Sequence, residues 1–71
     1  MEEKELCVII GKRIKQLRDE KGISQQELAL RCGFETSNMC RIESGRTNPT
    51  IVTLYKISQA MQVDLQQITR L

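Results

Sequence analysis

The sequence predicts an all-α fold, a compact bundle of five helices, and two kinds of observation support this prediction. Apolar residues recur three or four positions apart in five successive segments, which is the spacing of one face of an α-helix. Residues that begin or end helices stand between these segments. Ser24 and Thr50 are suited to cap helix starts. Glycine, which ends helices cheaply in the left-handed conformation, stands at positions 22, 33 and 45.

The first helix is predicted from about Glu3 to Lys21, with acidic residues near its start and Lys21 at its end, as the helix dipole favours. Its apolar stripe consists of Leu6, Ile10, Ile14 and Leu17. Val8 and Ile9 lie off this stripe, and Val8 points nearly the opposite way. We interpret Val8 as an incidental surface residue, and whether Ile9 belongs to a second contact surface stays open.

Residues 24–45 are predicted to form a short helix, a tight turn and a second short helix. Ser24 and Glu27 have the spacing of a capping box, which satisfies free backbone donors at a helix start. The glycine of the turn ends the first of these helices, and Phe34, the first apolar residue after it, is expected to insert into the core. The second helix is predicted over about 36–44.

The second of these helices has two chemically different sides. At about 100° per residue, Met39 and Ile42 point one way, toward the predicted core. Ser37, Arg41 and Ser44 point the opposite way. Short hydroxyl side chains allow a helix to approach a DNA major groove closely, and arginine can donate two hydrogen bonds to guanine. An ordinary solvated helix face is the alternative explanation of this side.

The last two helices follow a loop marked by Pro49, which has no N–H group and disfavours helical geometry in the residue before it. Thr50 can cap the fourth helix, whose apolar side consists of Ile51, Leu54, Ile57 and Met61. Gln62 stands at its end, where a left-handed conformation would cost about 1 kcal/mol relative to glycine. Asp64 and Gln67 form a second capping pair. The fifth helix carries Leu65, Ile68 and Leu71 at three-residue spacing.

The length and charge of the chain limit the classes of protein to consider. A chain of 71 residues predicts one domain, 1–71, and its net charge of +2 is only mildly basic. No apolar run approaches the ~20 residues that a membrane span needs. The acidic start of the chain differs from the basic start of a signal peptide. We therefore expect a cytoplasmic protein without a membrane partner.

The chain is poorly equipped for catalysis or metal binding. Cys7, Cys32 and Cys40 are odd in number and widely spaced, which argues against disulfides and a zinc site. Histidine, the commonest general base near neutral pH, is absent. We expect no catalytic residue, no metal and no cofactor. Cys32 is interpreted as core filler and Cys40 as a small residue near DNA, with a redox-sensitive thiol as the alternative for Cys40.

Residues Gly11 to Leu65 resemble the lambda Cro and 434 repressor family of helix-turn-helix proteins, often called the Xre family. The matching residues, in order and without gaps, are Gly11, Arg13, Ile14, Leu17, Arg18, Gly22, Ile23, Ser24, Gln25, Glu27, Leu28, Ala29, Gly33, Ser37, Arg41, Ile42, Glu43, Ser44, Gly45, Asn48, Pro49, Leu54, Ile57, Ala60 and Val63. The resemblance implies the lambda-repressor-like DNA-binding fold, with the helix-turn-helix at about 24–45.

The resemblance also implies roles for individual residues. The expected base contacts are Thr36, Ser37, Asn38 and Arg41. The expected phosphate contacts are Gln25, Ser44, Arg46 and Thr47. Arg18 and Glu43 match positions that form a structural salt bridge between the first and third helices. Glu35 departs from the family pattern, since a small capping residue is usual there, and this departure puts the register of the first base contact in doubt.

Family members of this kind commonly bind DNA as twofold dimers, so the resemblance implies a transcriptional regulator that binds a pseudo-palindromic operator as a homodimer. The third helix, about 36–44, is expected to enter the major groove. Leu65, Ile68 and Leu71 are the expected dimer interface, although Leu65 and Ile68 could instead simply close the core. Double-stranded DNA is the expected partner, with no small-molecule ligand. The alternative is a protein-interaction module, such as an antitoxin that covers a toxin and binds DNA secondarily.

Overall fold

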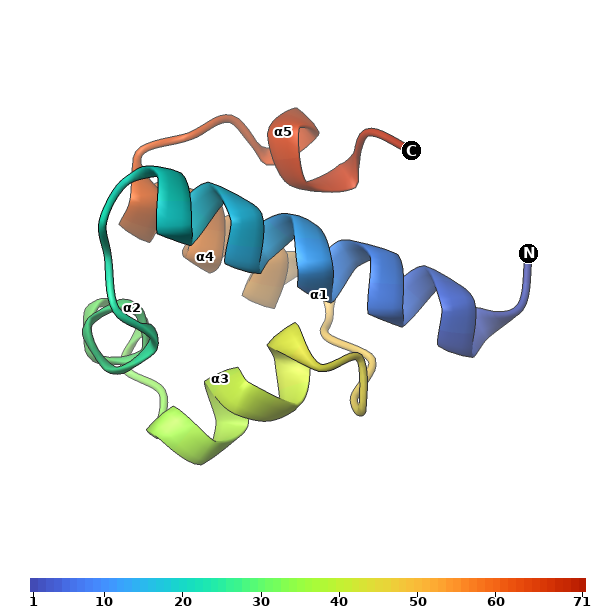
Figure 1. The fold of residues 1–71 in the computed structure, drawn as a ribbon, viewed down its shortest axis with the longest axis horizontal. Helices are drawn as coiled ribbons and strands as arrows, with labels where there is room; N and C mark the ends of the chain where they lie inside the picture. The colour runs from blue at the N-terminus through green and yellow to red at the C-terminus, as the bar shows by residue number, and fades with distance from the viewer.

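In the computed structural model, which describes every residue from Met1 to Leu71, the chain forms five α-helices and no β-strand, as Figure 1 shows. The helices are α1 (Glu3–Glu20), α2 (Gln25–Cys32), α3 (Thr36–Glu43), α4 (Ile51–Met61) and α5 (Leu65–Thr69). The predicted all-α, five-helix fold is therefore confirmed. The predicted boundaries differ from the observed ones by one residue at the ends of α1 and α3, and by more at α5.

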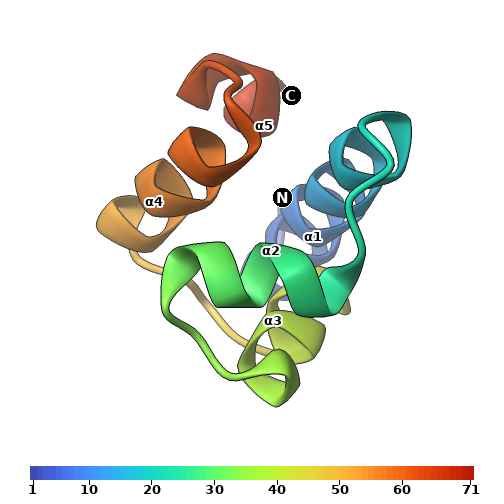
Figure 2. The ribbon, with the colours of Figure 1, turned by 90° about the vertical axis from the view of Figure 1, so that its left-hand side faces the viewer.

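The helices pack around α1, which runs along the longest dimension of the molecule (Figure 1). In that view α5 lies on one side of α1 and α3 on the other, and both contact it. Figure 2 shows α2 between α1 and α4, next to α3, and α2 contacts all three helices. Twelve apolar side chains form the core between them: Ile10, Ile14, Leu17, Ile23, Leu28, Ala29, Met39, Ile42, Leu54, Ile57, Met61 and Ile68.

Side-chain caps begin three of the helices. Ser24 accepts a hydrogen bond from the Glu27 N–H group at 3.0 Å, and Thr50 accepts one from the Thr53 N–H group at 3.1 Å. At α5 the full reciprocal capping box of Asp64 and Gln67 is present. The box predicted at α2 forms only in half, because the Glu27 carboxylate lies beside Arg31, 3.9 Å from its Nε atom. The capping residues in the sequence thus correctly predict where α2, α4 and α5 begin.

The helix ends use left-handed backbone. The glycines at 22, 33 and 45 have φ values of 68°, 74° and 77°. Gln62, which ends α4, is the one other residue with positive φ, at 59°. A side chain there costs roughly 1–2 kcal/mol because its Cβ approaches the backbone.

Two predictions about the apolar residues of α1 need correction. Val8 is not an incidental surface residue, because it packs against the turn after α3: a Cβ atom added to Gly45 would lie 2.6 Å from Val8 Cγ2. Leu6, expected in the core stripe, is 38% exposed at the protruding end of the helix.

Phe34, which follows the turn after α2 and is predicted to insert into the core, is only partly buried and packs against the margin of the core.

The C-terminal segment also differs from its predicted role as a dimer interface. Ile68 is fully buried, and Leu65 is partly buried against the same core. Both side chains therefore close the core of one molecule, as the alternative interpretation had it. Leu71 lies beyond the end of α5 and is 72% exposed. Of the three predicted interface residues, Leu71 alone is freely accessible to a partner.

Candidate nucleic-acid interface

Helix α3 has one buried and one exposed side, as its sequence predicts. Met39, Ile42 and Glu43 are buried against the rest of the bundle. The exposed side carries Thr36, Ser37, Cys40, Arg41 and Ser44, and Asn38 lies half-buried at its edge. The structure thus places the four predicted base-contacting residues on or beside one accessible surface, which we call the α3 face: Thr36, Ser37, Asn38, Cys40, Arg41 and Ser44.

Apart from Ser44, the polar side chains of the α3 face are free of internal partners. The structure contains no hydrogen bond from the side chains of Thr36, Ser37 or Asn38 to the rest of the protein. Arg41 likewise has no ion-pair partner. The Ser44 hydroxyl donates to the Arg41 carbonyl oxygen at 3.2 Å. An α-helix with its side chains is about 10–12 Å across, so α3 can fit into the DNA major groove, which is about 12 Å wide.

A buried ion pair holds α3 against α1. Arg18 Nε donates to Glu43 Oε2 at 2.8 Å and Nη2 donates to Oε1 at 2.9 Å, which is the bidentate geometry of a strong pair. Arg18 Nη1 also donates to the Ile23 carbonyl oxygen at 2.9 Å. The hydrogen bond to Glu43 is the main reason that the pKa of Arg18 is raised, so the guanidinium stays charged. The pair expected from the resemblance is therefore present between these two helices.

Gln25 joins this ion pair, which sequence reasoning missed. Its Nε2 atom donates to Glu43 Oε1 at 3.2 Å, so one carboxylate connects α1, α2 and α3. The side chain expected to contact a phosphate is therefore fixed through its nitrogen. Gln25 is the first residue of α2, so its backbone N–H group and those of the next residues point out of the start of the helix. An anion binds favourably at such a helix start.

Gly11 brings α1 and α3 unusually close together. A Cβ atom at this position would lie 2.5 Å from the carbonyl oxygens of both Ile42 and Glu43. Only glycine fits between these backbones without moving α3. A glycine inside an otherwise strong amphipathic helix is the sequence signal that points to this contact.

The turn between α3 and α4 carries the remaining predicted phosphate contacts. Ser44 and Arg46 are exposed and Thr47 is half-buried. The Arg46 N–H group donates to the Arg41 carbonyl oxygen at 3.0 Å, which fixes the start of the turn to the end of α3. Beside it lies a polar pocket of about 450 Å³, lined by Glu3, Lys4, Cys7, Ser44, Gly45, Arg46, Thr47 and Asn48.

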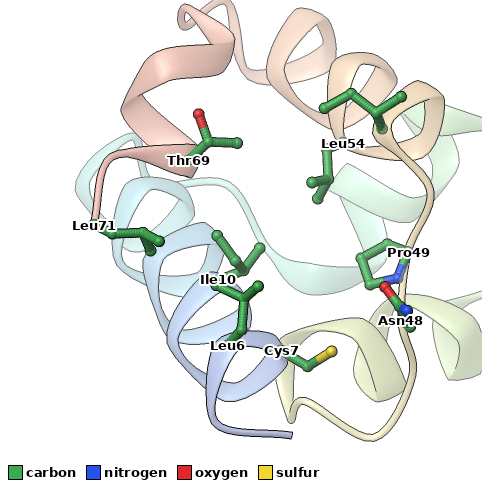
Figure 3. A pocket seen from close by; sticks show the side chains of 9 residues that line it. Leu6, Cys7, Ile10, Asn48, Pro49, Leu54, Thr69 and Leu71 are labelled. Carbon is green, nitrogen blue, oxygen red and sulfur yellow. The ribbon is translucent and has the colours of Figure 1, made fainter. Parts of the chain in front are cut away.

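An apolar pocket of about 350 Å³ adjoins this polar pocket through Cys7 and Asn48, and lies between α1, the start of α4 and the C-terminal segment (Figure 3). Its nine lining residues are Leu6, Cys7, Ile10, Asn48, Pro49, Ile51, Leu54, Thr69 and Leu71. The exposed Leu71 thus lies near the exposed Leu6 in this region. This pocket offers apolar contact rather than recognition of charge.

The cysteines are free thiols, and no group of three or more His, Cys, Asp or Glu side chains is placed to hold a metal ion. Cys32 is half-buried and lies 3.9 Å from the Lys56 carbonyl oxygen. Burial raises the pKa of its thiol above the ordinary value of 9.0, so the neutral form predominates. Cys40, in contrast, is exposed on the α3 face. No helix is long and apolar enough to cross a membrane.

Comparison with known proteins gives consistent results. The helix-turn-helix family profile matches residues 14–68. An uncharacterized HTH-type transcriptional regulator of Sinorhizobium fredii, y4dJ, is 42% identical over 55 residues, which are 78% of this chain and 71% of that protein. The HTH-type transcriptional regulator SinR of Bacillus subtilis is 43% identical over 61 residues, which are 84% of this chain and 55% of SinR. This chain therefore spans only about half of SinR.

Solved structures agree with the sequence matches. The restriction-modification controller protein C.AhdI from Aeromonas hydrophila has a TM-score of 0.84 and 31% identity, over 87% of this chain and 94% of that one. The biofilm regulator SinR, in a crystal structure with DNA, has a TM-score of 0.78 and 43% identity, over 84% of this chain and 97% of that one.

Proposed function

The chain belongs to the Xre, or lambda-repressor-like, family of helix-turn-helix DNA-binding transcriptional regulators, and on that premise we propose that it binds a pseudo-palindromic operator as a homodimer. In this proposal α3 enters the major groove of each half-site. Two copies related by a twofold axis would place their recognition helices about 34 Å apart, one turn of B-DNA.

The observation that carries the proposal is the α3 face. Apart from the Ser44 hydroxyl, which donates to the Arg41 carbonyl oxygen, the side chains of this face make no hydrogen bond within the protein. Behind it, the buried ion pair of Arg18 with Glu43 and the close contact at Gly11 fix the helix to α1. Free recognition groups on a rigidly held helix are what direct readout of bases requires.

The proposed contacts divide by chemistry. Thr36, Ser37, Asn38 and Arg41 contact bases, and the guanidinium of Arg41 pairs with a guanine, a contact worth about 1–3 kcal/mol of discrimination. Gln25, Ser44, Arg46 and Thr47 contact phosphates and set the position of the protein on the duplex. In support, a solved structure shows the similar protein SinR in complex with DNA.

The proposed dimer surface is centred on Leu71 rather than on the buried Ile68. Leu71 is exposed next to the apolar pocket, together with Leu6 and Ile51, which are also exposed. Burial of such a contiguous apolar patch against a second copy is favourable, because apolar surface leaves water.

The test is a titration of the protein against the DNA upstream of its own coding sequence and against a scrambled duplex, each at two salt concentrations. We expect salt-dependent binding with at least about a hundredfold preference for the upstream DNA. Arg41→Ala should weaken the specific complex far more than the random one. Arg46→Ala should weaken both and flatten the salt dependence.

Lys56→Ala is the charge control, because it removes a positive charge from an exposed position on α4 that lines neither the polar nor the apolar pocket. Equal losses on both duplexes for Arg41→Ala would remove its role as a base reader. Equal, weak binding of the unaltered protein to both duplexes would contradict operator recognition and favour a protein partner at the apolar pocket.

A further inference from the structure

The first turns of α1 make no DNA contact in the function proposed above. They precede residues 14–68, which match the family, yet they pack against the turn that follows α3 through the contact of Val8 with Gly45. We infer that Lys4 is an additional DNA phosphate contact, and that the polar pocket between α1 and the α3–α4 turn receives a backbone phosphate beside the operator. This inference rests on the proposed function.

The packing of α1 determines the direction in which Lys4 points. Val8 contacts Gly45, and Gly11 lies against the carbonyl oxygens at the end of α3. Lys4 is four residues before Val8 and seven before Gly11, so all three lie on one side of the helix. The side of α1 that faces α3 and the following turn therefore presents a lysine where the helix protrudes beyond the bundle.

The composition of the pocket suits a phosphodiester. Lys4 and Arg46 both line it, and neither has an ion-pair partner in the protein. The Ser44 and Thr47 hydroxyls are the short polar groups beside these two cations. Lys15 and Arg31, in contrast, already have acidic partners: Lys15 lies 3.1 Å from Asp19, and Arg31 lies 3.9 Å from Glu27. The pocket thus holds two uncommitted cations next to the end of the recognition helix.

Glu3 is the one acidic residue that lines this pocket. Its carboxylate opposes an incoming phosphate, whereas Lys4 attracts it. Neutral replacement of these two neighbours should therefore change DNA affinity in opposite directions. This pair gives the inference a test that loss of folding cannot imitate, because both side chains are exposed in the first turn of α1.

The experiment measures affinity for a mixed-sequence duplex and for the upstream DNA across a series of salt concentrations. Lys4→Gln should weaken binding to both duplexes by a similar factor, about three- to tenfold at low salt, and reduce the slope of log affinity against log salt by about 1. Glu3→Gln should strengthen binding to both by about two- to fivefold.

Lys56→Gln and Glu5→Gln are the controls, since they make the same charge changes at exposed positions that do not line the pocket, and Lys56 lies on α4 rather than on the side of α1 that faces α3. If Lys4→Gln and Lys56→Gln have the same affinity and slope, Lys4 makes no phosphate contact and the inference is overturned. A preference of the unaltered protein for the upstream DNA would then still support the proposed function. Without that preference, the proposed function fails. The role of Lys4 is then decided by the slope of log affinity against log salt that Lys4→Gln shows on the mixed-sequence duplex.

Discussion

At the scale of single residues, the carboxylate of Glu43 connects three helices. It accepts two hydrogen bonds from Arg18 on α1 and one from Gln25 on α2, while its own backbone ends α3. No buried side-chain polar atom in the protein lacks a hydrogen-bond partner. Such a network is costly to break in part, because each remaining group loses its partner inside the protein.

Glu43→Ala should lower the free energy of unfolding by about 3–5 kcal/mol, because it removes the buried partner of the Arg18 guanidinium and leaves only the exposed carboxylate of Asp19, 3.4 Å away, as a counter-charge. Urea unfolding followed by circular dichroism measures this loss. Glu27→Ala is the control: its carboxylate is half-exposed in its pair with Arg31, outside the Arg18 network, and the expected change is below about 1 kcal/mol. A loss for Glu43→Ala as small as that of the control would contradict the structural role of the ion pair.

Gly11→Ala should lower the free energy of unfolding by about 1–3 kcal/mol, although alanine is the better helix former. The reason is the 2.5 Å approach of the added Cβ atom to two backbone carbonyl oxygens of α3. DNA affinity should fall as well, because α3 must move. Gln16→Ala, at an exposed position of α1, should leave stability within about 0.5 kcal/mol and binding unchanged. Unaltered binding by Gly11→Ala would show that the contact does not position α3.

At the scale of elements, α5 is the shortest helix, with five residues, yet it contributes a fully buried side chain. Ile68 is part of the core, and Arg13 Nε on α1 donates to the Gln67 carbonyl oxygen at 2.7 Å. An isolated helix this short is unstable in water, so its packing against α1 and α4 maintains it.

Ile68→Ala should therefore lower the free energy of unfolding by about 2–5 kcal/mol, from lost burial and from the cavity left behind. The thermal midpoint, measured at a protein concentration where the chain is monomeric, reports this change. Leu71→Ala is the companion variant, since an exposed side chain outside the core should change monomer stability little. If both variants lose stability equally, the C-terminal segment packs differently from the structure described above.

The helices themselves were predictable from the sequence, because caps, glycines and apolar spacing act over a few residues. Contacts between distant segments were not. The helical pattern assigned Val8 to solvent, since nothing in that pattern indicates that the turn at Gly45 crosses this side of α1. The pattern of α5 likewise cannot show which apolar side chains meet α1, and it assigned Ile68 to an interface that its burial excludes. The hydrogen bond between Gln25 and Glu43 spans eighteen residues and also required the fold.

At the scale of the whole molecule, the polar pocket and the apolar pocket are neighbours, since Cys7 and Asn48 line both. The α3 face and the polar pocket adjoin one another through Ser44, whereas the apolar pocket opens between α1, α4 and the C-terminal segment. The longest extent of one copy is 31 Å, so two copies joined through the apolar region can span successive major grooves of one duplex. One small chain can thereby hold a DNA surface and a self-association surface at the same time.

Leu71→Asp should weaken dimerisation and operator binding together, because a carboxylate buried in an apolar interface is costly. Sedimentation measures the first effect and titration of the upstream DNA the second. Lys56→Asp, on the exposed side of α4 away from the apolar pocket, is the charge control and should leave the dimer intact. A dimer that forms equally well with Leu71→Asp would place the interface elsewhere.

The burial of Ile68 also has a consequence for synthesis of the protein. The helix-turn-helix segment leaves the ribosome well before residue 68, but α1 and α4 cannot complete their packing until α5 arrives. The nascent chain therefore stays without its finished core until almost all of residues 1–71 have been translated and released from the exit tunnel.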